Sequence, residues 1–231
     1  MRGTGVSGDG RAYSEQEVKA TLDRCRLTYL YEPAWPRLRE RVSRLLSGGT
    51  LVAWFQGAAD CSTTLAAGRA VLCDPSNRWA KENVNRFFRQ VDVDAEVPLV
   101  ALAGEEPWRA LHLTGCRLLN APAAAEWRNH VVGAIDREGC IHLYGIADAE
   151  ALHLCELLRH HQARTRVPAL IAVPFSASNE PVVSTPRDAI KAMFSSPIDV
   201  MVIERFIVAK DHWLLGTQGN ERAETPQRAS T

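Results

Sequence analysis

The chain has 231 residues, 46% of them hydrophobic, which is enough to bury the core of one large domain. Lysine and arginine together number 27, and so do aspartate and glutamate, so the formal net charge is zero. This balance excludes the strong positive field by which a protein attracts nucleic acid or an anionic membrane surface. The six cysteines form no C-x-x-C pair, which argues against a zinc site or a disulfide framework and favours free thiols in a reducing cytoplasm.

The composition predicts one folded domain with a disordered or flexible segment at each end. Residues 1–12 and 213–231 are rich in Gly, Ser, Thr, Gln and charge, so we expect a disordered N-terminus, a single domain over 13–212 and a flexible tail. No apolar signal region opens the sequence, and no stretch approaches the roughly 20 apolar residues that a membrane span needs. A cytoplasmic protein without membrane or nucleic-acid partners is therefore expected.

Helical and strand patterns alternate along the first hundred residues. Ser14 followed by Glu17 is a capping box that predicts a helix running to about Cys25. Apolar residues at helical spacing over 35–46 predict a second helix, which the sequence Ser-Gly-Gly at 47–49 ends. The run 50–55 is continuously apolar and predicts a buried strand. A helix over 81–88 and a strand over 97–102 follow by the same criteria.

The second half of the chain predicts a mixed sheet. We expect a hairpin of 130–135 and 140–144 around the turn 136–139, then a helix over 148–163 with Asp148 as its N-cap. Residues 167–173 read as a strand that Pro174 ends, and Thr185 with Pro186 begins another helix. The last strands are expected at 198–203 and 206–208. The fold class is thus α/β, with a twisted mixed sheet, flanking helices and an open cleft.

The sequence LVAWFQG at 51–57 leads the first buried strand into a polar loop, DCSTT at 60–64. Loops at strand ends are where α/β folds bind their ligands, so a pocket is expected here. Further blocks follow at ordered spacing: GRAVLCDP at 68–75, Lys81 with Asn85, EPVVSTPRDA at 180–189 and IDVMVI at 198–203. Together with SEQEV at 14–18, these blocks resemble the C-terminal, YrdC-like domain of the O-carbamoyltransferases that modify nodulation factors and antibiotics.

The resemblance spans about residues 13–210 and implies an activity. In that family, the YrdC-like domain activates carbamoyl phosphate with ATP as a carbamoyl-adenylate, and a separate N-terminal metal-binding domain transfers the carbamoyl group to an alcohol. This chain resembles only the first of these domains. The transfer step would then depend on another chain, so a separate transfer-domain or tailoring protein is an expected partner, beside a small-molecule ligand.

The charged residues that this chemistry needs are mostly replaced. Two anionic substrates must be held by several arginines and lysines, which the family supplies in the stretch G-R-x-E-F-G-P-R-A-L-G-x-R-S. Here the first two arginines fall on Ala58 and Thr64, the acidic residue on Asp60, and only the third is matched, by Arg69. In the next family segment, Arg89 stands for the lysine. The arginines expected there near 91 and 95 are absent. Three acidic residues at 92, 94 and 96 make the net charge of this segment negative instead of positive.

Asp60 and Cys61 are the candidate catalytic residues. Asp60 could act as a general base if desolvation raised its pKa, and its alternative role is a loop or helix-capping carboxylate. Cys61 could act as a nucleophile if a base or Arg69 activated its thiol, and its alternative role is a small buried side chain. The candidate ligand-binding residues share the strand-end loops and the helix after the second block: Trp54, Gln56, Thr64, Arg69, Lys81, Asn85, Arg89, Phe175, Ser176 and Ser178.

No metal site is predicted. His153 and His160 lie seven residues apart on one helix face, but no third ligand stands at a fixed spacing from them. The sequence does not identify a cofactor. The expected function is that of a divergent, stand-alone carbamoyltransferase-type domain, recruited to a different small-molecule reaction in natural-product biosynthesis, with activation by ATP and carbamoyl phosphate impaired. The alternatives are a non-catalytic partner subunit of a full-length carbamoyltransferase or tailoring enzyme, and active carbamoyl-adenylate synthesis.

Overall fold

The computed structural model describes residues 11–58, 68–89, 91–113, 118–176 and 180–215. These residues form an α/β domain around one nine-stranded mixed sheet, in the order β1-β9-β8-β2-β3-β7-β4-β6-β5. The strands are β1 (Leu30–Tyr31), β2 (Val52–Phe55), β3 (Arg69–Cys73), β4 (Pro98–Leu102), β5 (Leu119–Pro122), β6 (Cys140–Ile146), β7 (Ala169–Pro174), β8 (Val200–Ile203) and β9 (Phe206–Ala209). The prediction of an α/β fold with a mixed sheet is confirmed.

Two parallel pairs, β2 with β8 and β4 with β6, sit among antiparallel neighbours. At the middle of the sheet β2 lies between β8 and β3, with Phe55 opposite both Ile203 and Arg69. All four residues of β2 and all five of β3 are buried. The strand end that carries the predicted loop is therefore anchored in the most enclosed part of the sheet.

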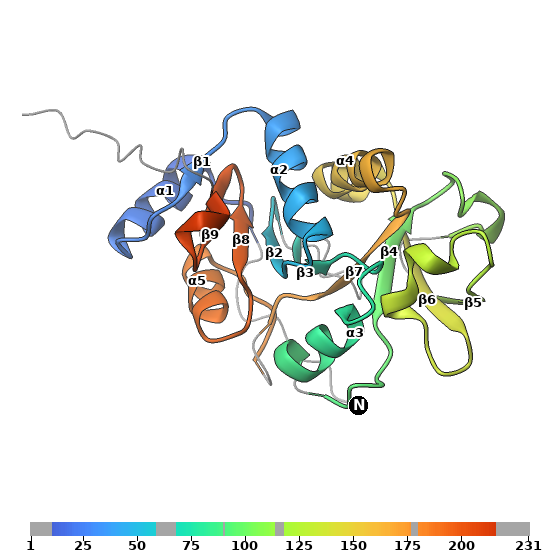
Figure 1. Ribbon diagram of the computed structural model, residues 1–231. Helices are drawn as coiled ribbons and strands as arrows, with labels where there is room; N and C mark the ends of the chain where they lie inside the picture. Colours follow the sequence, from blue (N-terminus) through green and yellow to red (C-terminus); the bar gives the residue numbers. More distant parts are fainter. Residues whose placement is uncertain (1–10, 59–67, 90, 114–117, 177–179, 216–231) are drawn as a thin grey trace, which may run out of the picture.

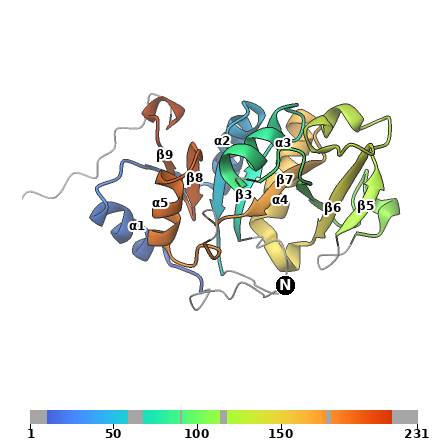
Figure 2. The ribbon, with the colours of Figure 1, turned by 90° about the horizontal axis from the view of Figure 1, so that it is seen from below.

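Helices cover both faces of the sheet (Figure 1). On one face lie α2 (Trp35–Ser47) and α4 (Asp148–Thr165), which bury Leu38 and Leu154 against Trp54. Toward the other face lie α1 (Glu15–Arg24), α5 (Pro186–Phe194) and the short helix α3 (Ala80–Glu82), which continues as a π-helical segment over Asn83–Arg89 (Figure 2). The strands alternate between the two cores, because successive side chains of a strand point to opposite faces.

The helix ends follow from local sequence. The Ser14 hydroxyl accepts a hydrogen bond from the Glu17 amide, and the Glu17 carboxylate bonds back to Ser14, so the predicted capping box is present. Helix α2 ends at Gly48, as the sequence Ser-Gly-Gly predicted. Helix α4 begins at Asp148 and departs from helical geometry at Ala151, where φ is −154°. The predicted helix over 81–88 is mostly π-helical.

The predicted hairpin of 130–135 with 140–144 is wrong. Residues 128–134 form two short 3₁₀ turns, and β6 pairs with β5 on one side and β4 on the other. The reason is a close contact with the segment after β3: the Gly133 amide donates to the Pro75 carbonyl at 2.7 Å, and a Cβ at Gly133 would lie 2.0 Å from the Asn77 oxygen. This backbone is bound elsewhere and cannot form a strand edge.

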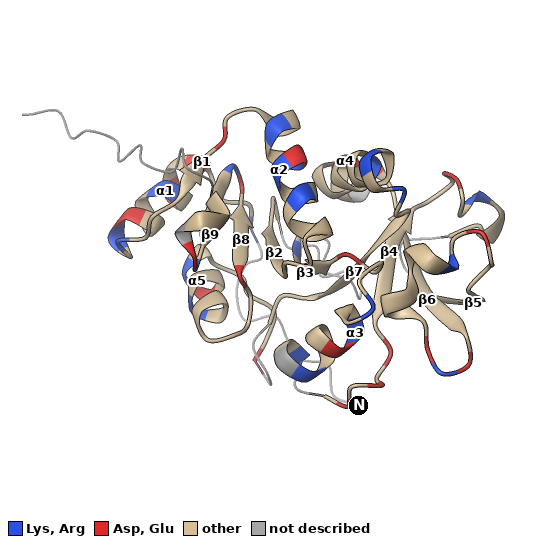
Figure 3. Ribbon diagram, viewed as in Figure 1, with Lys and Arg blue, Asp and Glu red and all other residues tan. Residues whose placement is uncertain are grey.

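The predicted terminal segments lie almost wholly outside the described residues, except for Arg11, Ala12 and residues 213–215, which belong to the final 3₁₀ turn His212–Leu215. Among the helices that the structure describes, none combines the length and apolar character of a membrane span. Figure 3 shows basic and acidic residues interleaved on α1 and α2, as the balanced composition predicts.

Candidate functional site

The candidate site begins where the end of β2 lies beside the start of β3. Gly57 has φ of +56°, a backbone conformation that favours glycine, and it turns the chain out of β2. Gly68, just before β3, comes so close to the other strand end that a Cβ would lie 2.5 Å from the Gln56 carbonyl oxygen. The two glycines allow the chain to leave and re-enter the sheet at one narrow point, which places Gln56 and Arg69 together.

Arg69 is fully buried, and its guanidinium binds the backbone of this junction. Nη1 donates to the carbonyls of Gln56 and Gly68, each at 2.8 Å, and Nη2 donates to Gly57 at 2.8 Å and to Arg11 at 3.4 Å. The guanidinium carbon also lies 3.4 Å from the centre of the Phe55 ring. Desolvation lowers the pKa of Arg69 to about 10. Four of the five donors of this side chain are thus used within the protein.

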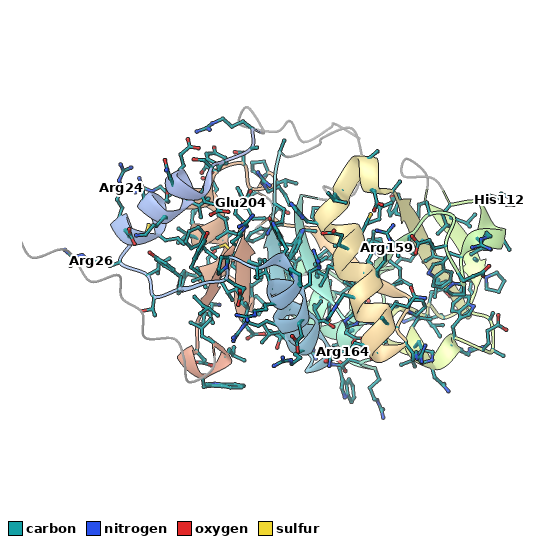
Figure 4. The ribbon with its side chains drawn as sticks, turned by 90° about the horizontal axis from the view of Figure 1, so that it is seen from above. Arg24, Arg26, His112, Arg159, Arg164 and Glu204 are labelled. Carbon is teal, nitrogen blue, oxygen red and sulfur yellow. The ribbon has the colours of Figure 1, made fainter. Side chains whose placement is uncertain are left out.

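Glu204, in the turn between β8 and β9, completes the junction, and sequence reasoning missed it. Its carboxylate accepts from the Gly57 amide at 3.0 Å, and its backbone carbonyl accepts from Gln56 Nε2 at 3.0 Å. Burial raises the pKa of Glu204, although the Gly57 hydrogen bond and the Arg69 charge act against this. Figure 4 shows Glu204 between α1 and the central strands. The sequence did contain a signal for this residue: Glu204 is a single carboxylate between the apolar runs 198–203 and 206–208, which predict strands.

Two polar atoms at this junction are buried without a hydrogen-bond partner among the described residues. They are Gln56 Oε1, an acceptor, and Arg69 Nε, a donor. A buried polar group without a partner costs about 1–3 kcal/mol, and such groups in native structures call for an explanation. The junction can therefore offer one acceptor and one donor to a further partner, rather than a set of open cationic groups.

Asn85 and Arg89 form a second group on the π-helical segment. Arg89 Nη1 donates to Asn85 Oδ1 at 2.8 Å and to the Glu96 carbonyl at 2.9 Å, and Asn85 Nδ2 donates to the Val93 carbonyl at 3.2 Å. Burial lowers the pKa of Arg89. Lys81 lies one turn earlier and is half-buried. As at Arg69, these polar side chains hold a loop, here residues 93–96.

The structure brings together only part of the predicted site. Phe175 lies buried beside Arg69, whose carbonyl accepts from the Phe175 amide at 2.9 Å, and Ser176 follows it. Trp54 is 1% exposed and packs under α2 and α4, on the opposite face from Phe55. Asp60, Cys61, Thr64 and Ser178 lie outside the described residues, so their roles stay predictions.

A Ser-His-Asp chain lies elsewhere, at the end of β3. His161 on α4 contacts Ser43 Oγ through Nδ1 at 2.9 Å and Asp74 Oδ2 through Nε2 at 3.2 Å. The order is that of a hydrolytic triad, but Ser43 is fully buried and also accepts from Arg164 Nε at 3.0 Å. Arg164 lies on α4 (Figure 4). Because no substrate can reach Ser43, the chain is a structural link between the sheet and its covering helices.

In the other α4 histidines, the buried atoms His153 Nδ1 and His160 Nε2 have no hydrogen-bond partner among the described residues. His153 stacks on Trp35 with ring centroids 3.8 Å apart and 14° between the planes, and its Nδ1 lies 3.7 Å from Glu156. Burial lowers the pKa of both His153 and His160. Within the described ranges, neither of them belongs to a group of three metal-ligating side chains.

These features define an α/β domain whose central strand end is closed by a buried arginine, Arg69, and a half-buried glutamate, Glu204. The sequence profile of the family described as Carbamoyltransferase C-terminus matches residues 43–210. The chain belongs to this family, and the resemblance seen in the sequence is confirmed.

The curated relatives are distant and longer. An uncharacterized protein of Synechocystis is 24% identical over 197 residues, which cover 74% of this chain and 31% of the relative. The nodulation protein NolO of Bradyrhizobium diazoefficiens is 23% identical over 171 residues, covering 71% of this chain and 31% of NolO. An uncharacterized protein of Methanocaldococcus jannaschii is 21% identical over 201 residues. The chain thus spans about a third of the length of these relatives.

The solved structures that resemble this chain share less sequence with it than the curated relatives do. The threonine complex of Pyrococcus abyssi Sua5 gives a TM-score of 0.48 at 13% identity and covers 74% of this chain and 47% of Sua5. Escherichia coli YciO gives the same TM-score at 12% identity, with 78% of this chain and 90% of YciO covered.

Proposed function

We propose that this chain is a divergent carbamoyltransferase-type domain that does not activate carbamoyl phosphate with ATP, and that it acts on a less charged small molecule in a biosynthetic pathway. The observation that carries the proposal is the position of the Arg69 guanidinium. Its Nη donors bind four backbone carbonyls, so the one arginine that matches the family stretch has no bidentate face for a phosphate.

The charge balance supports the same proposal. Ala58 and Thr64 stand at the other two arginine positions of the stretch, and two further arginines are absent near residues 91 and 95. A hydrogen bond to a charged group contributes about 1.5–3 kcal/mol, so losing four of them costs about 6 kcal/mol or more. That loss moves a micromolar Kd for ATP beyond the millimolar range. The remaining polar atoms, Gln56 Oε1 and Arg69 Nε, suit a neutral group with a donor and an acceptor.

The first test is pyrophosphate release by the full chain with ATP and carbamoyl phosphate, with calorimetric titration of ATP beside it. We expect no release above the enzyme-free background and no heat of binding below about 1 mM ATP. A full-length family member with all three arginines is the positive control. Robust pyrophosphate release would contradict the proposal and restore carbamoyl-adenylate synthesis as the function.

A gain-of-function variant sharpens this test. Ala58→Arg combined with Thr64→Arg returns two of the missing charges, so the double variant should bind ATP at least tenfold more tightly than the wild type if phosphate charge is what was lost. The matched control is Ala58→Gln with Thr64→Gln, which adds similar bulk without charge. Equal affinity of the two double variants would mean that the lost arginines do not limit ATP binding.

The inward orientation of Arg69 also favours a second candidate, a non-catalytic partner subunit of a carbamoyltransferase or tailoring enzyme. Such a subunit needs the fold and its surface but no phosphate site. Co-purification with a full-length carbamoyltransferase, together with an increase in the turnover of that enzyme, would support the partner role. Turnover of a small molecule by the isolated chain would support the enzyme role instead.

A further inference from the structure

Three metal-ligating side chains converge at the start of β6, away from the Arg69 junction. They are His142 on β6, Asp136 in the turn before it, and Glu96 in the loop before β4. His142 Nε2 lies 3.1 Å from Asp136 Oδ2 and 3.5 Å from Glu96 Oε1, and the three atoms lie within 4.8 Å of one another. In the sequence Glu96 lies 40 residues before Asp136 and 46 before His142, which is why no ligand spacing pointed to this group.

Two of the three side chains are held in place. The His142 side chain is 5% exposed and lies on β6, the strand next to the sheet edge, between Pro98 of β4 and Asn120 of β5. Asp136 accepts the amides of Glu138 and Cys140 on Oδ1, at 2.9 and 2.8 Å, which turns Oδ2 toward the imidazole. Hydrogen bonds of this kind, which orient a ligating group from behind, are typical of metal sites.

The third side chain is held at its backbone and free to adjust at its tip. Arg89 Nη1 donates to the Glu96 carbonyl, and Asn85 holds the same loop through Val93. The Glu96 side chain is 62% exposed, so its carboxylate can move to complete a coordination sphere. This exposure also gives an ion a path from solvent.

A simple two-centre hydrogen bond from His142 reaches only one of the two carboxylates that face it. An imidazole nitrogen carries at most one hydrogen, yet two carboxylate oxygens face the same Nε2. In a tetrahedral site with bonds of about 2.0–2.1 Å, neighbouring ligand atoms are about 3.3 Å apart. The observed separations of 3.1 and 3.5 Å lie on either side of that value.

We propose that Glu96, Asp136 and His142 form a binding site for a divalent transition metal, with Zn²⁺ as the best match. One imidazole and two carboxylates suit zinc, whereas Mg²⁺ and Ca²⁺ prefer all-oxygen sites with six or more ligands. Three protein ligands leave a fourth position for water. The bound ion would tie the 93–96 loop to β6 and so brace the loop that Asn85 and Arg89 hold. This site does not depend on the proposed function.

The test is calorimetric titration of the metal-free full chain with ZnCl₂, with Co²⁺ absorption as a second readout. We expect one site that Glu96→Gln and Asp136→Asn each weaken at least tenfold, since losing even an orienting partner of a metal ligand costs 10–100-fold. Asp136→Asn keeps an oxygen for the two amides, so the turn can still form. Both variants should melt within a few degrees of the wild type without metal.

Asp94→Asn is the matched control, because Asp94 lies in the same loop but pairs with Arg137. It should leave zinc affinity unchanged. Zinc binding of equal strength in all three variants would place the ion at other side chains, such as the exposed Cys25, and overturn the proposal. No binding to the wild type at 100-fold excess over protein would overturn it equally.

Discussion

At the scale of single residues, Arg69 shows how a family position can survive while its role changes. A guanidinium offers five donors in a fixed fork, which suits a phosphate or carboxylate. Here four donors bind the backbone carbonyls of the strand-end junction. The same geometry that would hold a ligand now holds the protein, so the ligand-anchor role suggested by the sequence competes with a structural one.

Replacing Arg69 separates these roles. Arg69→Ala leaves several carbonyls without donors, at about 1–3 kcal/mol for each buried one, so the free energy of unfolding should fall by about 3 kcal/mol or more. Arg69→Lys should recover only part of this loss, because an ammonium has three donors and no fork. Urea denaturation monitored by circular dichroism measures both effects.

The control for these variants is Arg187→Ala, which removes an exposed arginine from α5 and should change stability by no more than about 0.5 kcal/mol. If Arg69→Ala were as stable as this control, the internal hydrogen bonds would contribute nothing. Arg69 would then be better explained as a ligand anchor.

At the scale of elements, α5 depends on a capping box. The Thr185 hydroxyl accepts from the Asp188 amide at 3.1 Å, and the Asp188 carboxylate accepts from the Thr185 amide at 3.0 Å. We expect Thr185→Ala to lower the free energy of unfolding by about 1 kcal/mol, since it leaves the Asp188 amide without its cap. Thr185→Ser keeps the hydroxyl and should lose much less. Equal losses in the two variants, measured by urea denaturation, would mean that the methyl group and not the cap matters.

Elements with a local sequence signal could be predicted, including the apolar strands β2, β4, β7 and β8. Strands without such a signal, which are recognised only by their pairing, could not. Helix ends depend on residues only a few positions away in the sequence, as the caps at Ser14 and Thr185 and the end of α2 at Gly48 show. In contrast β1 has two residues, β5 has four, and β3 is stabilised by β2 and β7, which come from distant parts of the sequence. No strand was predicted for these three segments, because a pairing partner leaves no periodic pattern in the strand itself.

The same limit applies to the site. Gln56 and Arg69 were found because each lies in a sequence block that resembles the family, at 51–57 and 68–75, and the structure places them together. Glu204 and the Glu96, Asp136 and His142 group were missed, since their members meet only when strands far apart in sequence become neighbours. The choice of face was also out of reach: strand alternation puts Trp54 and Phe55 on opposite faces, but the block at 51–57 does not show which of the two cores each side chain enters.

At the scale of the whole molecule, the Asp74, His161 and Ser43 chain joins the end of β3 to α4 and α2. Burial opposes ionisation of Asp74, but hydrogen bonds from His161 and from the Ser76 amide and side chain outweigh it, and the pKa lies below its ordinary value of 3.8. An ionised Asp74 is therefore favoured by the folded state. Glu204 acts in the opposite sense, because burial raises its pKa above 4.5.

These directions predict how stability depends on pH. A carboxyl with a depressed pKa stabilises the fold above its unfolded value of about 3.9, and that contribution is lost as pH falls through the lower folded value. For Asp74 the loss thus comes below about pH 4. Glu204 gives a gain as pH falls from 7 through its raised pKa, since the folded state then binds the additional proton. Taken together, these two carboxyls favour the folded state most in mildly acidic solution, whereas His153 and His160, whose pKa values burial lowers, act against it below about pH 6.5.

Asp74→Asn isolates the first contribution, because Glu204 is present in both proteins. The variant should be less stable than the wild type at pH 7, by about 1–3 kcal/mol for the lost charge-assisted bond to His161, and the difference should shrink steadily below about pH 4. Val42→Ala, a core truncation on α2 that removes no ionisable group, should stay below the wild type by a constant amount. Urea denaturation at pH 7, 5 and 3 measures all three proteins. A gap between wild type and Asp74→Asn that stayed constant down to pH 3 would mean that the buried chain stabilises the fold without depending on the charge of Asp74.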